Sequence, residues 1–150
     1  MPGLIWTSPH LRHGRKPRMR ALIDSGLWWR RYHGLPLSRR LARFLEQDVS
    51  EFWLCPLSIQ EMLYKWRHRR LPAPDPTDWL SEALSGYRLA PVTFDAGKLA
   101  GLWEWEHGDP VDRLLAAVAQ TEGLTLVHTD QRLRPLAGFP QQYFPNVGME

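Results

Sequence analysis

Two carboxylates of this chain directly follow short apolar runs of the kind that form buried strands. Asp24 ends the run Ala21-Leu22-Ile23, and Asp130 follows the run over residues 124–129. The carboxyl ends of parallel strands meet at one edge of a sheet, where ligands of such folds bind. We therefore expect Asp24 and Asp130 to lie close together at a functional edge.

Three further acids are expected near the same edge. Glu61 lies four residues after Leu57, on the first turn of a predicted helix. Asp109 and Asp112 lie on the first turn of the predicted helix that leads into residues 124–129. Carboxylates packed closely repel one another and raise one another's pKa. A Mg²⁺ or Mn²⁺ ion relieves that repulsion and activates water against a phosphate, so the pattern points to metal-dependent phosphodiester hydrolysis.

Each of these acids also has a structural explanation. Ser58-x-x-Glu61 matches a capping box, in which the glutamate only returns a hydrogen bond to the backbone of the cap. Asp109 precedes Pro110 and fits an ordinary helix cap, and Asp112 favours the helix dipole. Helix capping does not require acids at the ends of separate strands, so the combination favours a metal site.

Strands and helices alternate along the chain, which predicts an α/β fold with a parallel sheet of four or five strands, covered on both faces. The predicted strands are residues 21–23, 52–57, 87–92, 124–129 and 142–144, and the predicted helices are 26–32, 38–47, 58–69, 76–84, 95–103 and 110–122.

The length of 150 residues fits one folded domain. A single cysteine excludes a disulfide framework, and no apolar run is long enough to span a membrane. The first 20 residues lack the apolar centre of a secretory signal, so we expect a cytoplasmic protein. Residues 1–19 show no periodicity and are expected to form a flexible basic extension before a domain over residues 20–150.

The formal net charge of +3 is distributed unevenly. Lys and Arg dominate residues 1–70, whereas Asp and Glu dominate residues 75–130. A basic region beside an acidic one suits a site that binds both metal and phosphate. Charges that only solvate helix faces are the alternative. His107 has two interpretations, as a general base or as a hydrogen-bonding loop residue, and Trp103 and Trp105 could border the acidic edge.

Four segments, in this order and spacing, carry a family resemblance over about residues 20–145. The segments are Leu22-Ile23-Asp24-Ser25, residues 57–61 (LSIQE), residues 107–115 (HGDPVDRLL) and residues 123–130 (GLTLVHTD). In these segments the chain resembles PIN-domain proteins of the VapC toxin type.

The resemblance implies a three-layer α/β/α sandwich around a central parallel sheet. It also implies an endoribonuclease toxin that hydrolyses RNA phosphodiester bonds with Mg²⁺ or Mn²⁺. Asp112, rather than Asp109, is the third acid of the family pattern. The implied catalytic and metal-binding residues are Asp24, Glu61, Asp112 and Asp130.

Ser25, Asp109 and Thr129 are expected to support the four acids. Ser25 stands where the family commonly has Thr, and its hydroxyl can still bond a carboxylate or a water. Gly26 departs from the family pattern, which usually has a large or polar residue there. That departure favours an alternative function, a non-catalytic RNA- or protein-binding domain with a degraded metal site.

The resemblance also implies the partners of the protein. A homodimer is expected, together with a small cognate antitoxin that blocks the acidic pocket with a basic side chain and contacts the helices around Trp66 and Trp79. RNA is expected to approach along basic side chains that position its phosphates. These side chains are Arg30, Arg31, Lys65, Arg67, Arg69 and Arg70.

Overall fold

The computed structural model of this protein describes residues 18–145. The predicted flexible extension therefore lies outside the described residues, apart from Arg18 and Met19. Met19 is already part of the sheet, because it is the first residue of β1 (Met19–Ile23) and pairs with Val49. No helix in the described part combines the length and hydrophobicity that a membrane span needs.

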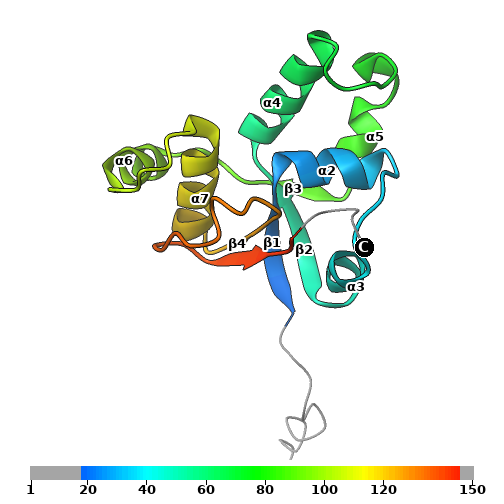
Figure 1. Ribbon diagram of the computed structural model, residues 1–150. Helices are drawn as coiled ribbons and strands as arrows, with labels where there is room; N and C mark the ends of the chain where they lie inside the picture. Colours follow the sequence, from blue (N-terminus) through cyan, green and yellow to red (C-terminus); the bar gives the residue numbers. More distant parts are fainter. Residues whose placement is uncertain (1–17, 146–150) are drawn as a thin grey trace, which may run out of the picture.

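A sheet of five parallel strands forms the centre of the molecule (Figure 1), as the sequence predicted. Its strand order is β3-β2-β1-β4-β5. The other strands are β2 (Val49–Leu54), β3 (Tyr87–Leu89), β4 (Thr125–His128) and β5 (Gln141–Tyr143).

Helices cover both faces of this sheet, which completes the expected three layers. Ala21 and Ile23 of β1 face one core with the side chains of α2, α3, α4 and α5, whereas Leu22 faces a second core with those of α6 and α7 (Figure 1). The helices are α2 (Ser25–Tyr32), α3 (Arg39–Gln47), α4 (Pro56–Arg67), the 3₁₀ helix η2 (Pro76–Asp78), α5 (Leu80–Leu84), α6 (Phe94–Leu102) and α7 (Pro110–Glu122).

The order of the strands reverses direction at β1. The chain proceeds from β1 to β2 and β3 on one side, and then returns to place β4 and β5 on the other. Ile23 of β1 is paired with Val127 of β4, so the two strands end beside each other. In open parallel sheets, such a reversal leaves a crevice beyond the carboxyl ends of the two strands. Asp24 and Asp130 emerge at this crevice.

The boundary between β2 and α4 differs from the prediction. The strand ends at Leu54 rather than at residue 57, and α4 begins at Pro56 after Cys55 as its N-cap. Proline suits the first turn of a helix because its missing N–H would have no partner there. Ser58 is therefore buried within the first turn and is not the cap, so the capping-box interpretation of Glu61 was wrong. Glu61 lies on the second turn of α4.

The predicted helix over residues 76–84 is also divided in the structure. Asp75 caps the short η2 by accepting a hydrogen bond from the N–H of Thr77, and α5 follows only after Trp79. By contrast, α7 begins and ends as predicted. Asp109 is its N-cap, and Gly123 ends it with a φ of 68°, a left-handed conformation that glycine adopts without strain.

The second core makes a direct prediction about stability. Leu115 of α7 is 1% exposed, so Leu115→Ala leaves a cavity and is expected to lower the free energy of unfolding by about 2–5 kcal/mol. Leu102→Ala is the matched control, because Leu102 is 76% exposed on α6 and should change little. Urea unfolding followed by tryptophan fluorescence measures both. Equal losses for the two variants would contradict this assignment of the core.

Candidate metal centre

The backbone of β1 and β4 places Asp24 in the crevice. Asp24 continues the strand pairing, since its N–H donates a hydrogen bond of 3.1 Å to the carbonyl of Val127. It also occupies the N-cap position of α2, but its carboxylate makes no capping hydrogen bond. Burial, followed by the negative charges of Asp112, Glu61 and Asp130, raises the pKa of Asp24 to about 7. The carboxyl group is therefore only partly ionised at neutral pH in the absence of a cation.

The first turn of α7 divides two tasks between two aspartates. Asp109 caps the helix, because its Oδ1 accepts hydrogen bonds from the N–H groups of Val111 and Asp112. This leaves the Asp112 carboxylate available to the crevice. Burial is the main cause that raises the pKa of Asp112, and a hydrogen bond from His107 opposes it.

Asp130 lies directly beyond β4 and is already paired with a cation. The guanidinium of Arg132 donates to both of its carboxylate oxygens at 3.2 and 3.1 Å. Partial burial alone would raise the pKa of Asp130, but the hydrogen bonds and charge of Arg132 outweigh it and lower the pKa. The Nη2 of Arg132 also lies 3.9 Å from Oδ2 of Asp112. Arg132 therefore offsets negative charge on two of the acids, a role that the sequence analysis did not predict.

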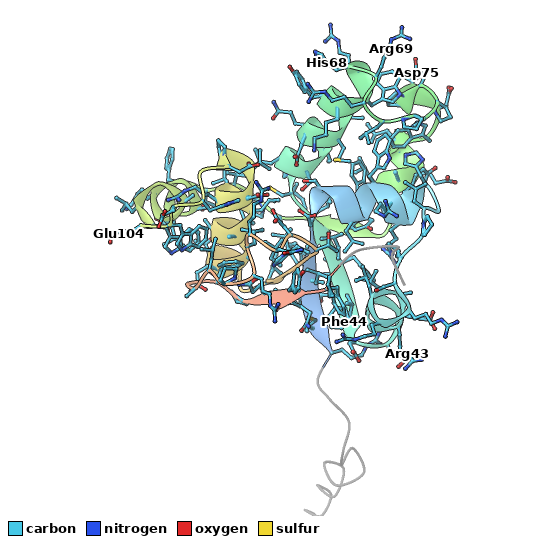
Figure 2. The ribbon with its side chains drawn as sticks, viewed as in Figure 1. Arg43, Phe44, His68, Arg69, Asp75 and Glu104 are labelled. Carbon is cyan, nitrogen blue, oxygen red and sulfur yellow. The ribbon has the colours of Figure 1, made fainter. Side chains whose placement is uncertain are left out.

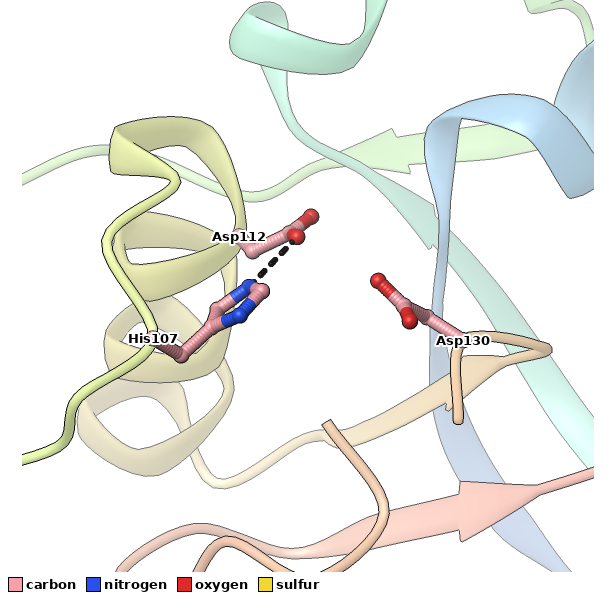
Figure 3. Close-up of side chains that lie close together, drawn as sticks. All are labelled: His107, Asp112 and Asp130. Atoms are coloured by element: carbon pink, nitrogen blue, oxygen red, sulfur yellow. Dashed lines mark hydrogen bonds and ion pairs between the residues drawn. The ribbon is translucent and has the colours of Figure 1, made fainter. Parts of the chain in front are cut away.

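His107 belongs to this site. Its Nε2 lies 2.9 Å from Oδ2 of Asp112, and its side chain is only 9% exposed. His107, Asp112 and Asp130 each offer one ligand atom, and these atoms lie within 4.8 Å of one another (Figure 3). The two carboxylate oxygens at this spacing can hold a divalent ion, while Nε2 of His107 is engaged with Asp112. The proximity of His107 to Asp109 in the sequence was the only signal of its position.

The loop that carries His107 is held in place by Arg113. The guanidinium donates hydrogen bonds to the carbonyls of Ala100, Trp103, Trp105 and His107. One side chain thus joins the end of α6 to the start of α7. Trp103 and Trp105 stack on each other beside this network, with ring centroids 4.0 Å apart.

Glu61 approaches the site from α4 and is held by Lys65. The ammonium of Lys65 lies 3.2 Å from Oε2 of Glu61 in an ion pair across one helical turn. Neither Glu61 nor Asp24 belongs to the group within 4.8 Å, although the charge of Glu61 contributes to the raised pKa of Asp24. The structure therefore brings the four predicted acids close enough for their charges to interact, and it places His107 beside Asp112 and Asp130.

The expected supporting residues differ in their surroundings. Ser25 is buried, and its Oγ has no hydrogen-bond partner among residues 18–145, as befits a hydroxyl that bonds a cation or a water beside Asp24. Thr129 is partly buried between β4 and Asp130. Gly26 does not disturb the helix: a Cβ there would lie 3.9 Å from Oδ2 of Asp24, an ordinary contact.

The six basic residues predicted to bind RNA fall into two groups. Arg30 and Arg31 lie in the last turn of α2 and serve the fold: Arg30 donates to the carbonyl of Pro36, and Arg31 donates to the Tyr87 hydroxyl. The second group lies along α4 and just beyond it, and Figure 2 shows Arg69 at the end of this helix, away from the sheet. This group comprises Lys65, Arg67, Arg69 and Arg70.

The raised pKa of Asp24 predicts that this carboxylate destabilises the metal-free protein. The folded state holds the Asp24 proton up to about pH 7, so stability falls as the pH rises from about 4 to 7 and stays low above that. Asp24→Asn removes this loss and is expected to raise the free energy of unfolding at pH 8 by roughly 2–4 kcal/mol.

Urea unfolding in EDTA at pH 4 and pH 8 measures this difference. Asp95→Asn is the matched control, because Asp95 is exposed on α6. If Asp24→Asn does not raise the free energy of unfolding at pH 8, or raises it equally at both pH values, the Asp24 carboxyl is not desolvated.

Comparisons with known proteins agree with this fold. The family model of the PIN domain matches residues 21–138. No curated protein matches the chain.

Solved toxin–antitoxin structures resemble the chain in fold. A chain of the DNA-bound VapBC from Salmonella typhimurium has a TM-score of 0.63 at 14% identity, covering 83% of this chain and 98% of that one. VapBC2 from Rickettsia felis, bound to a fragment of promoter DNA, gives a TM-score of 0.60 at 12% identity, covering 84% and 99%. A toxin–antitoxin complex from Klebsiella pneumoniae gives 0.57 at 17% identity, covering 75% and 89%.

The switch-point crevice, the acids around it and the family match over most of the chain agree with one another. This protein therefore belongs to the PIN domain family, and its fold is that of the VapC-type members.

Proposed function

We propose that this protein is a metal-dependent endoribonuclease that acts as the toxin of a toxin–antitoxin pair. One observation carries the proposal: four carboxylates converge on the switch point between β1 and β4, and burial with mutual repulsion raises the pKa of Asp24 to about 7. Such an arrangement costs stability in the absence of a cation, so a binding function explains why it is retained.

The donor set fits Mg²⁺ or Mn²⁺. Asp24, Asp112 and Asp130 supply hard oxygen ligands, with Glu61 as a fourth acid and the unpartnered Ser25 hydroxyl beside them. An ion held by these residues supplies Lewis acidity toward the phosphate and the attacking water.

The remaining residues position the acids and balance their charge. His107 donates to Asp112 and fixes the orientation of its carboxylate, as histidines and carboxylates around metal sites commonly do. Arg132 holds Asp130 and offsets its charge. Its guanidinium also lies where it can meet a phosphate drawn into the crevice.

The toxin role rests on the fold and on the partial exposure of Asp112 and Asp130, whose side chains are 16% and 26% exposed. Arg132 demonstrates that a guanidinium fits against Asp112 and Asp130, which is the group that an antitoxin with a basic side chain would present. Of the two tryptophans considered for antitoxin contacts, Trp79 is 7% exposed and belongs to the core, so Trp66 is the better candidate. We also propose that the protein forms a homodimer.

RNA cleavage tests the enzymatic proposal. Purified protein with labelled transfer or ribosomal RNA is expected to cut in Mg²⁺ or Mn²⁺ and to stop in EDTA. Asp112→Asn and Asp130→Asn each remove a ligand, so each should slow cleavage by more than the roughly 10- to 100-fold typical of residues that only support a ligand.

Asp95→Asn again serves as the control, since it removes an exposed carboxylate on α6 and should retain full activity. Cleavage that survives both ligand substitutions, or no cleavage with either metal, would overturn the nuclease proposal and favour the non-catalytic RNA- or protein-binding alternative.

Growth tests the toxin proposal separately. Induction of the protein in a bacterial host is expected to arrest growth, and co-expression of the small reading frame beside its gene should relieve the arrest. Asp112→Asn should not arrest growth, because it removes a metal ligand. Equal arrest by the wild type and Asp112→Asn would show that toxicity does not depend on this site.

A further inference from the structure

A cavity of about 340 Å³ lies between α4 and the start of α7, directly beside the acidic crevice. Two of its lining residues belong to the edge of that crevice: Glu61 itself, and Val111, which precedes Asp112. Leu57 and Val111 give it apolar walls, and Gln60 adds an amide to the lining. A ligand seated in the cavity would therefore adjoin the group held by the acids.

The outer wall of the cavity is an exposed aromatic side chain. Tyr64 of α4 is 58% exposed and lines the cavity. Its ring packs against the imidazole of His68, with centroids 4.1 Å apart and planes tilted by 35°. The two rings form a platform on α4, and Figure 2 shows His68 at the end of this helix.

Cationic side chains stand at the rim of the same cavity. Lys65 forms an ion pair with Glu61, and Arg70 follows the end of α4. Within residues 18–145, the Arg70 side chain makes neither an ion pair nor a hydrogen bond. A phosphate group would complement Arg70, because its guanidinium is not offset by an acid within residues 18–145, whereas Lys65 is paired with Glu61.

From this geometry we infer that the cavity beside α4 is a nucleotide subsite that holds an unpaired RNA base, next to the phosphate bound at the acids. The base would lie between the apolar walls and the ring of Tyr64, while Arg70 holds a neighbouring phosphate. This inference rests on the proposed ribonuclease function and deepens it, since it assigns Tyr64 and the cavity beside it to the positioning of one base of the RNA substrate.

The lining suits an RNA base, because the Gln60 amide can hydrogen-bond a base edge beside the apolar Leu57 and Val111. A base presents an aromatic face to Tyr64 and keeps its charged backbone at the basic rim, as single-strand binding sites commonly arrange. Bases within a duplex are already stacked and cannot enter.

Binding measurements test this inference in an Asp24→Asn background, which prevents turnover. The probe is a fluorescein-labelled single-stranded RNA of twelve nucleotides with mixed sequence. Tyr64→Ala is expected to weaken its affinity by about 5- to 100-fold, as for loss of one base–aromatic stack. Tyr64→Phe keeps the ring and should bind like the parent. Phe94→Ala is the matched control, because Phe94 is 94% exposed on α6, outside the cavity, and should change nothing.

Two results with RNA would overturn the subsite: parent-like affinity for Tyr64→Ala, or equal affinity for duplex and single-stranded RNA. A third result would also overturn it: Tyr64→Ala binds RNA normally but no longer binds the proposed antitoxin, the product of the small reading frame beside the gene. Cleavage by the wild-type protein is measured separately with Mn²⁺. If the wild type cuts RNA but Tyr64→Ala binds normally, only the subsite fails. If it cuts nothing while Tyr64→Ala weakens binding, the nuclease proposal fails and the subsite stands.

Discussion

The pairing of β1 with β4 is the constraint on which the site depends. Ile23 and Val127 lie opposite each other and are completely buried, so the strands cannot slip without exposing the centre of the core. This register ends the two strands side by side and forces Asp24 and Asp130 into one crevice. The hydrophobic core therefore supplies the free energy that holds like charges together, and Asp24 bears the cost as a raised pKa.

The protein offsets this repulsion unevenly. Arg132 compensates the charge of Asp130 and Lys65 that of Glu61, whereas His107 donates a hydrogen bond to Asp112. Among residues 18–145, no basic side chain forms an ion pair with Asp24, and this carboxyl group has its pKa raised furthest toward neutrality. A site whose charges were all neutralised internally would have little affinity left for a cation. The incomplete compensation thus connects the stability of the fold to the binding function proposed for it.

The N-terminal ends of α7 and α4 set the positions of the site residues. Asp109 satisfies the first N–H groups of α7, which frees Asp112 for the crevice, and Arg113 binds the carbonyls of the preceding loop so that His107 reaches the same carboxylate. On the other side, the early start of α4 at Pro56 moves Glu61 one turn further into the helix. The same shift places Glu61 in the wall of the cavity beside α4, where the acidic crevice meets an apolar space.

The sequence by itself determined the parallel α/β fold, the strand-end positions of Asp24 and Asp130, and the cap at Asp109, because apolar runs, helix breakers and capping residues act over a few neighbouring positions. It placed the start of α4 wrongly, since a run that is apolar throughout does not mark where a buried strand becomes a helix. Only the tertiary structure decided that His107 meets Asp112, that Arg132 pairs with Asp130, and that Tyr64 faces an open cavity. Those contacts depend on the directions of the side chains and on the packing of α4 and α7 beside the crevice. The spacing of residues along the chain does not predict either of these.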